Sequence, residues 1–307
     1  MSLHRLTTIT IGVPDPDTTA DYYRDFGLTE LGGYRFGTVD GGEQLRIART
    51  PQRRLLRLGI GVHDPDDLAR IGSQLDTLDI AYATDDSSLT VQDPNSSLTV
   101  VMEIAPEIVQ QPAAWPVTNG PGRHDRRDER ADGIGRTGPV RPRKLGHVVI
   151  GSLDQEASQR FFAEGLGFKI SDTVPGLAAF MRCSTDHHNV LVQQAPLNFL
   201  HHTAWEVDDV DEVGRGASSM LEADPERHVW GLGRHHIGSN FFWYLKDPAG
   251  NFSEYYSDLD CVVDDALWKP EVVEGMKGLY NWGPPPPPSF LAPEDLAALM
   301  TGSHAPN

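Results

Sequence analysis

The chain has 307 residues, enough for two domains of ordinary size with a hydrophobic core in each. Hydrophobic residues make up 39% of it and charged residues 23%, which is typical of a folded globular protein. Its 26 Lys and Arg residues stand against 44 Asp and Glu residues, giving a formal charge of −18. Such a surface repels phosphate backbones and anionic lipids, so we expect neither nucleic acid nor a membrane as a partner.

The two cysteines, Cys183 and Cys261, lie far apart and form no C-x-x-C pattern. This argues against a disulfide framework and against a thiolate metal site. Residues 1–10 lack the apolar run of a signal peptide, and no stretch approaches the roughly 20 apolar residues that span a bilayer. We therefore expect a cytoplasmic protein.

In chain order, the elements indicate one module written twice. Each half opens with a predicted strand and a helix, continues with a strand that leads into an acidic helix start, and closes with an Asp-Pro turn and a strand. The matching segments are residues 6–27 and 145–165, then 58–66 and 202–210, then 90–103 and 244–256. This pattern predicts an α+β protein of tandem βαβββ modules, with two similar domains that each form a curved, partly open barrel of mixed sheet.

Composition divides the chain into four parts. Residues 1–109 form the first module and residues 144–257 the second. Between them, residues 110–143 are rich in Pro, Gly, Arg and Asp, which indicates a linker or surface loop; its Arg residues lie in solvent or contact an acidic partner. Residues 258–307 form a Pro-rich arm in which Pro284 to Pro288 predict a stiff polyproline II segment. The arm is either a surface strut or a cover for an active site or a neighbouring subunit.

Four segments of the second half carry the histidines, tyrosine and glutamate on which a functional interpretation depends. They are residues 145–149, 200–204, 234–235 and 244–254. A single histidine on a strand is more often a core or surface residue, so the interpretation depends on these segments together.

These four segments resemble type I extradiol dioxygenases of the vicinal-oxygen-chelate, or glyoxalase/bleomycin resistance, superfamily. The resemblance extends from residue 6 to about residue 256. It implies that His147 in the first predicted strand, His202 in the middle strand and Glu254 after the closing turn hold Fe(II), with Mn(II) as an alternative. Such a set leaves three adjacent positions of an octahedron open, and imidazole and carboxylate ligands suit Fe(II). It also implies that the substrates are a catechol and O₂, and that the ring opens beside the diol.

The resemblance assigns three further residues. His188 corresponds to the family histidine that faces bound oxygen and acts as an acid or base, which suits a side chain whose ordinary pKa is about 6.5. His235 and Tyr244 correspond to the histidine and tyrosine that bind the catechol oxygens. His187 and His236 stand next to two of these histidines, so the register at both positions stays open.

Comparison of the two halves indicates that the first half lacks the metal ligands. The first half has Thr8 at the position of His147, Arg57 at that of His202 and Val100 at that of Glu254. None of these suits iron, so we expect the first module to be vestigial and free of metal.

Neighbouring residues complete the predicted pocket. His201 is expected to point to the opposite face of its strand from His202, because side chains alternate. Phe180, Trp205 and Trp243 are expected to line an apolar substrate pocket.

Two alternative hypotheses remain. One is another metalloenzyme of the same fold, such as a Mn(II) dioxygenase, an isomerase or a resistance enzyme. The other is a metal-free protein that binds an aromatic ligand. The resemblance further implies a homo-oligomer, with a tetramer favoured.

Overall fold

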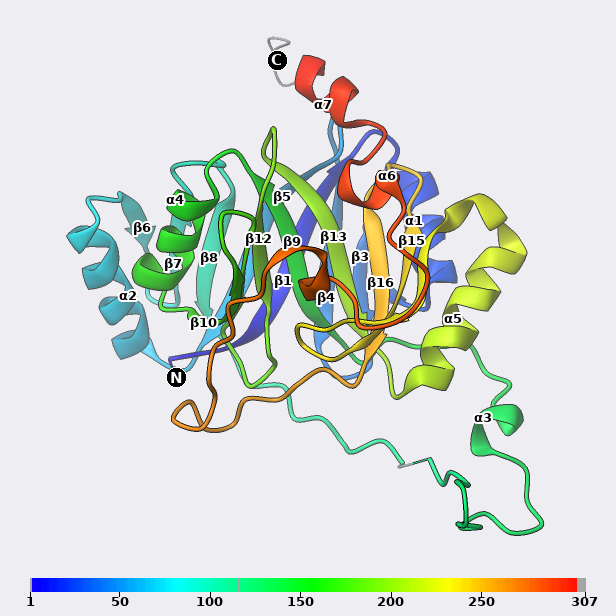
Figure 1. Cartoon of the computed structure of the whole chain (residues 1–307). Coiled ribbons are helices and arrows are strands. Elements are labelled where there is room, and N and C mark those ends of the chain that lie inside the picture. The colour runs from blue at the N-terminus through cyan, green and yellow to red at the C-terminus, as the bar shows by residue number, and fades with distance from the viewer. Residues whose placement is uncertain (1, 115, 303–307) are drawn as a thin grey trace.

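The computed structural model describes residues 2–114 and 116–302, and its strands form two eight-stranded mixed sheets, one from each half of the chain (Figure 1). The sheets are curved and open at their edge strands, so the tandem βαβββ prediction is confirmed. The first sheet contains β1 (Leu3–Val13), β2 (Thr29–Gly32), β3 (Arg35–Thr38), β4 (Gly42–Arg49), β5 (Arg54–Val62), β6 (Tyr82–Thr84), β7 (Ser88–Gln92) and β8 (Thr99–Ile104).

The second sheet has the same plan. Its strands are β9 (Lys144–Ser152), β10 (Lys169–Val174), β11 (Ala178–Arg182), β12 (Val190–Gln194), β13 (Phe199–Glu206), β14 (His228–Arg234), β15 (Phe241–Lys246) and β16 (Phe252–Ser257). In each sheet the first strands of the two βαβββ units, β1 with β5 and β9 with β13, pair antiparallel at the centre. Each of them pairs in parallel on its other side with the last strand of a unit, β4, β8, β12 or β16.

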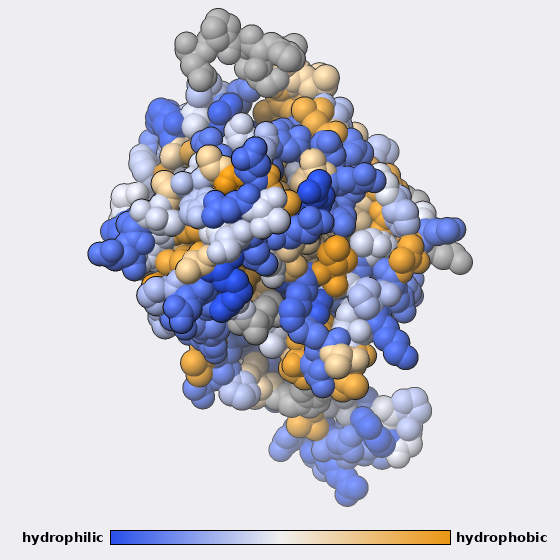
Figure 2. All heavy atoms as spheres, turned by 90° about the vertical axis from the view of Figure 1, so that its left-hand side faces the viewer, coloured by the Kyte–Doolittle hydropathy of each residue, from blue (hydrophilic) through white to orange (hydrophobic). Residues whose placement is uncertain are grey.

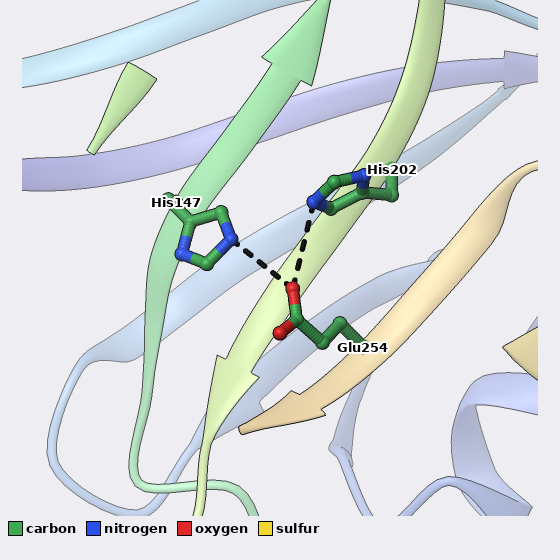
Figure 3. Close-up of side chains that lie close together, drawn as sticks. All are labelled: His147, His202 and Glu254. Atoms are coloured by element: carbon green, nitrogen blue, oxygen red, sulfur yellow. Dashed lines mark hydrogen bonds and ion pairs between the residues drawn. The ribbon is translucent and has the colours of Figure 1, made fainter. Parts of the chain in front are cut away.

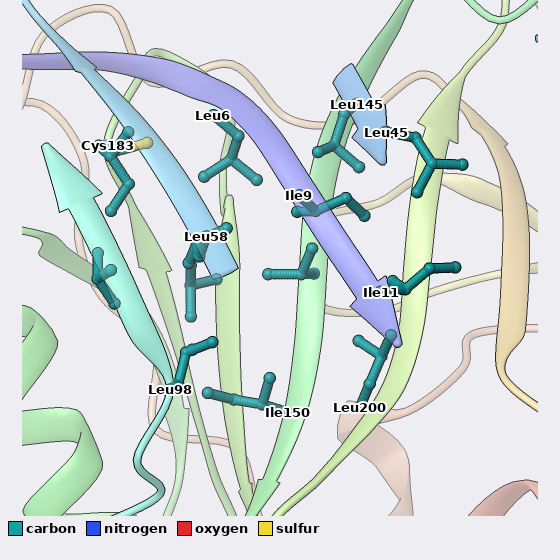
Figure 4. Close-up of a cluster of buried hydrophobic side chains, with 14 of the residues drawn as sticks. Leu6, Ile9, Ile11, Leu45, Leu58, Leu98, Leu145, Ile150, Cys183 and Leu200 are labelled. Carbon is teal, nitrogen blue, oxygen red and sulfur yellow. The ribbon is translucent and has the colours of Figure 1, made fainter. Parts of the chain in front are cut away.

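The two sheets stack face to face, and most of the hydrophobic core lies between them (Figure 4). From the first sheet come buried side chains such as Ile9, Leu58 and Val100, and from the second come Val148 and Ile150. Side chains alternate along a strand, so these residues commit one face of each sheet to the shared core. The opposite face of the second sheet does not contribute to this shared core.

Helices fill the two sides of this stack. The helices α2 (Pro65–Thr77) and α4 (Gln155–Arg160), with its continuation η1 (Phe161–Gly165), lie on one side, and α1 (Pro16–Asp25) and α5 (Val210–Ala223) lie on the other (Figure 1). Helix α1 starts where Asp15 accepts hydrogen bonds from the amides of residues 17 and 18, with Pro16 in its first turn. At its end, the ring of Phe26 stacks on Tyr255 of β16 with centroids 3.9 Å apart, which joins the two modules.

Two segments lie outside the paired sheets. The linker contains the short helix α3 (Asp132–Gly135) and extends away from the body below α5 (Figure 1). The C-terminal arm runs in front of the second sheet and contains η3 (Gly275–Gly278), α6 (Pro288–Leu291) and α7 (Leu296–Gly302). In residues 2–114 and 116–302, no helix combines the length and apolar character needed to cross a membrane. The face drawn in Figure 2 is mostly hydrophilic, with apolar residues in small separate groups.

The contact between Phe26 and Tyr255 generates a stability prediction. The Tyr255 hydroxyl donates a 2.7 Å hydrogen bond to the Phe26 carbonyl, and both groups are buried. Tyr255→Phe leaves that carbonyl without its partner, so we expect the free energy of unfolding to fall by about 1–2 kcal/mol in urea titrations. Tyr34→Phe is the matched control, because the Tyr34 hydroxyl bonds to Asp17 at the surface. Equal losses in both variants would contradict the prediction.

Candidate metal centre

Strand pairing brings the candidate ligands into one row across the second sheet. Ala204 of β13 pairs with His147 of β9 on one side and with Glu254 of β16 on the other. His202 stands two residues before Ala204, and Tyr244 of β15 pairs with Glu254. Directly paired residues, and residues two apart on a strand, share a face of the sheet. All four functional side chains therefore emerge on the face that is turned away from the shared core.

The predicted ligand atoms lie close together (Figure 3). One carboxylate oxygen of Glu254 is 3.1 Å from Nε2 of His147 and 3.5 Å from Nε2 of His202. The ligand atoms of the three residues all lie within 4.8 Å of one another. All three side chains are buried, and Glu254 is 0% exposed. The sequence-predicted ligand set thus forms one compact group.

The donor set fits a metal ion. Bonds of about 2.0–2.2 Å at right angles separate neighbouring donor atoms by about 3 Å, close to the two spacings around Glu254. In the described chain, the ion-pair partners of Glu254 are all histidines. Asn240 adds a hydrogen bond of 3.0 Å from its amide to the other carboxylate oxygen. A buried carboxylate without Lys or Arg is costly unless a cation joins it.

His201 differs from the prediction. It lines the same cavity as His202 instead of the opposite face, because the β9–β13 pairing shifts register between Leu200 and His202. Its two ring nitrogens lie 2.7 Å from Nδ1 of His202 and 2.7 Å from the carbonyl oxygen of Phe290. Burial lowers the pKa of His201 to about 4.

The structure brings His188, and not His187, to the cavity. The ring of His188 lies 4.2 Å from that of His147, and burial, followed by the charge of His147, lowers the pKa of His188 well below 6.5. His187 turns the other way, with its Nε2 2.9 Å from the carboxylate of Asp172 and its Nδ1 3.1 Å from Nδ1 of His188. Asp172 was not predicted, since nothing in its local sequence indicates a partner for His187.

The second histidine pair divides in the same manner. His235 is 12% exposed, with its Nε2 2.8 Å from the hydroxyl of Tyr244 and its Nδ1 hydrogen-bonded to the carbonyl of Leu279. His236 is 46% exposed and lies 3.9 Å from Glu271, away from the cavity. Burial lowers the pKa of His235 and raises that of Tyr244.

These residues line a cavity of about 60 Å³, far below the roughly 300 Å³ at which ligand pockets usually begin. Its walls are mostly apolar. Besides the histidines and Tyr244, they comprise Val149, Phe180, Leu191, Gln193, Ile237, Gly278, Leu279 and Phe290. The last three belong to the C-terminal arm, which therefore covers the site, one of the alternatives that the sequence left open.

Of the three aromatic residues expected in the pocket, only Phe180 lines it. Trp205 is adjacent to Ala204 and Trp243 is adjacent to Tyr244, so alternation turns both indole rings to the opposite face of the sheet. There Trp205 joins the shared core and Trp243 packs against it.

Strand pairing supports two equivalences between the modules and corrects the third. Arg57 pairs with Thr10 as His202 pairs with Val149, so Thr8 and Arg57 keep the places of His147 and His202. Gly59 follows Arg57 by two residues, as Ala204 follows His202, and it pairs with Val101. Val101, and not Val100, therefore takes the place of Glu254.

Known proteins match both the sequence and this arrangement. Residues 144–255 match the model of the Glyoxalase/Bleomycin resistance protein/Dioxygenase superfamily. Metapyrocatechase 2 of Cupriavidus necator is 30% identical over 94% of this chain and 92% of its own length. The chain belongs to the extradiol dioxygenases.

Further comparisons support a metal site and the fold. An iron-dependent extradiol dioxygenase of Rhodococcus jostii is 30% identical over 40% of this chain and 46% of its own length. The Mn(II)-bound glyoxalase of Novosphingobium aromaticivorans superposes with a TM-score of 0.73 at 23% identity, covering 93% of this chain and 95% of that one. Relatives of this extradiol dioxygenase are thus named for iron or manganese, and its His147, His202 and Glu254 form a group that could hold a metal ion.

The first site prediction concerns Glu254. Glu254→Gln removes the anionic ligand while keeping the size of the side chain, so we expect most metal to be lost on dialysis. Loss of a residue that hydrogen-bonds to a metal ligand usually weakens metal binding by roughly 10–100-fold. Loss of the ligand itself should weaken metal binding by more than that. Metal content measured by elemental analysis, with circular dichroism as a check on folding, tests this.

Glu103→Gln is the matched control, because Glu103 lies on β8, the strand of the first module that corresponds to β16. Its metal content should equal that of the wild type. Full metal retention in Glu254→Gln would rule Glu254 out as a ligand.

Proposed function

We propose that this protein uses Fe(II), held by His147, His202 and Glu254, to cleave a catechol beside its two hydroxyl groups with O₂. The observation that carries the proposal is the row of His147, Ala204, Glu254 and Tyr244, which gathers two imidazoles, a carboxylate and a phenol on one buried face. When bound, the ion supplies open coordination positions and lowers the pKa of a coordinated hydroxyl group. Mn(II) is the alternative ion.

Ala204 supports this proposal by its size. It lies between His147 and Glu254 in the row, and its methyl group leaves the space above the strand free for the ion and substrate. The first module has Gly59 in the corresponding place, paired with Val101 instead of a carboxylate. We propose that this module is a metal-free scaffold.

Tyr244 and His235 act together on the substrate in this proposal. The carbonyl of Leu279 accepts the proton of His235 Nδ1, so Nε2 of neutral His235 accepts the hydrogen bond of the Tyr244 hydroxyl. The phenol oxygen keeps its lone pairs for a catechol hydroxyl. His235 thus orients Tyr244, and the pair binds one edge of the catechol.

His188 holds the proton that the reaction moves. Asp172 accepts from Nε2 of His187, so Nδ1 of neutral His187 accepts from Nδ1 of His188. This leaves the lone pair of His188 on Nε2, the nitrogen that takes a proton from the substrate and later returns it. The apolar walls formed by Phe180, Leu191 and Ile237 exclude water while this happens.

The arm and the surroundings complete the proposal. Because the cavity is only about 60 Å³, Leu279 and Phe290 must shift for a catechol to enter, so the arm acts as a cover. The free cysteines and acidic surface fit a reducing cytoplasm. We also propose a homotetramer, since the edge strand β2 is exposed along its whole length and is open to pairing.

The function is tested with protein loaded with Fe(II) under argon and then exposed to air and a catechol. We expect one O₂ consumed per catechol and a yellow ring-opened product. Monocyclic, carboxylated and biaryl catechols should be compared, and Mn(II)-loaded protein identifies the working ion. Absence of O₂ uptake with every catechol and both ions would refute the proposal.

His188→Phe tests the proton-holding role. The variant should keep its metal and bind catechol, and its turnover should fall by roughly 10²–10⁴-fold, the usual contribution of general acid-base catalysis. Single-turnover kinetics separates the two effects. His236→Phe, which changes an exposed histidine outside the cavity, should react at the wild-type rate. A normal rate in His188→Phe would remove this residue from the mechanism.

A further inference from the structure

A chain of hydrogen bonds links the C-terminal arm to a candidate metal ligand. The carbonyl oxygen of Phe290 lies 2.7 Å from Nε2 of His201. Nδ1 of His201 lies 2.7 Å from Nδ1 of His202, and Nε2 of His202 lies 3.5 Å from Glu254. His201 and His202 are both buried.

The donor and the acceptor of each hydrogen bond follow from the group at the end of the chain, which is the carbonyl of Phe290. A carbonyl oxygen only accepts, so Nε2 of His201 carries a proton. In neutral His201 the other nitrogen, Nδ1, is then an acceptor, and Nδ1 of His202 must donate to it. Neutral His202 therefore has its lone pair on Nε2, the nitrogen that faces Glu254. Only this tautomer of His202 can bind a metal from that side.

We infer that His201 and the main-chain carbonyl of Phe290 are positioning groups that hold His202 in its metal-binding tautomer. The inference rests on the proposed metal site. Ligand histidines commonly donate their second N–H to a carboxylate, a carbonyl or water. Here a second histidine stands between the ligand and a carbonyl, and that carbonyl belongs to the arm.

The arm is fastened at the point where this contact forms. The Phe290 ring is 4% exposed and packs against Trp230, Tyr244 and Phe252. Five residues later, Asp295 accepts two hydrogen bonds from the guanidinium of Arg53, which is also 4% exposed.

Arg53 belongs to the first module, immediately before β5. Its guanidinium also donates a 2.7 Å hydrogen bond to the carbonyl of Leu200, the residue before His201. One side chain of the first module therefore holds the arm and the ligand strand together.

His147 provides the internal contrast. Its Nδ1 is buried and has no hydrogen-bond partner in the described chain. Of the two candidate ligand histidines in the described chain, only His202 thus has a hydrogen-bond partner at its Nδ1 atom. Consequently, the affinity for metal should depend on His201 and on the seating of the arm, although neither touches the ion.

Two substitutions of His201 separate tautomer control from packing. His201→Phe keeps an aromatic ring against Phe252 and Phe290 but removes both nitrogens, whereas in His201→Asn the Oδ1 atom can take the place of the Nδ1 acceptor. Dissociation constants for Fe(II) and Mn(II) are measured by equilibrium dialysis under argon. We expect binding about 10–100-fold weaker in His201→Phe and within about threefold of wild type in His201→Asn. His236→Phe should bind as the wild type does.

Removal of residues 288–307 tests the contribution of the arm. It should weaken metal binding in the wild-type background and have little further effect in His201→Phe, because the carbonyl acts only through that side chain. Where the shortened chain fails to fold, Asp295→Ala loosens the same segment and should show the same non-additivity.

The outcomes distinguish this inference from the proposed function. If the wild type binds neither ion, the metal site itself is wrong. If the wild type binds metal and His201→Phe binds it equally well, or if the losses from His201→Phe and the deletion add, the site stands and the tautomer relay is refuted. Equal weakening in His201→Phe and His201→Asn would show that only the shape of the ring matters.

Discussion

The buried charge of Glu254 is the constraint on which the rest of this structure depends. Its carboxylate lies on an inner strand of the second sheet, 0% exposed, with imidazoles, one amide and the phenol of Tyr244 as its neighbours. Such a charge is tolerated only when a cation and hydrogen bonds compensate for the lost water. The stacked sheets are consistent with this requirement, because the shared core occupies one face of the second sheet and the polar groups lie on the other face. The arm then closes that face, so the low dielectric that makes the charge costly also strengthens its attraction to an ion.

Each of two histidine doublets combines one side chain that faces the cavity with one that orients it. In both, the two Nδ1 atoms meet, at 3.1 Å between His187 and His188 and at 2.7 Å between His201 and His202. A carboxylate terminates the first doublet and a main-chain carbonyl terminates the second. In each case the terminal acceptor determines which nitrogen of the inner ring carries a proton. In the proposed mechanism the same device prepares His188 to exchange protons and His202 to bind metal.

The sequence predicts much of the fold and of the ligand set, because both depend on local patterns. The repeated strand, helix and Asp-Pro turn indicate the two modules, and the family resemblance selects His147, His202 and Glu254 as candidate ligands. It also favours His188 over His187 and His235 over His236, and in the structure the favoured member of each pair lies at the cavity. What the sequence misses is non-local. Asp172, Phe290 and Arg53 come from distant segments, and a register shift in β13 displaces His201 from the position that simple alternation gives it. A turn one residue longer in the first module makes Val101, and not Val100, the counterpart of Glu254.

The row of Thr8, Gly59 and Val101 has a consequence for stoichiometry. In the first sheet it takes the places that His147, Ala204 and Glu254 take in the second. None of its members is a histidine or a carboxylate, and the side chains of Thr7 and Glu103, which hydrogen-bond to each other, lie against Gly59. The two modules therefore share a sheet plan and differ in the side chains on this face. Among residues 2–114 and 116–302 a ligand set of this kind occurs once, so duplication of the module produced a support for one reaction centre instead of a second centre.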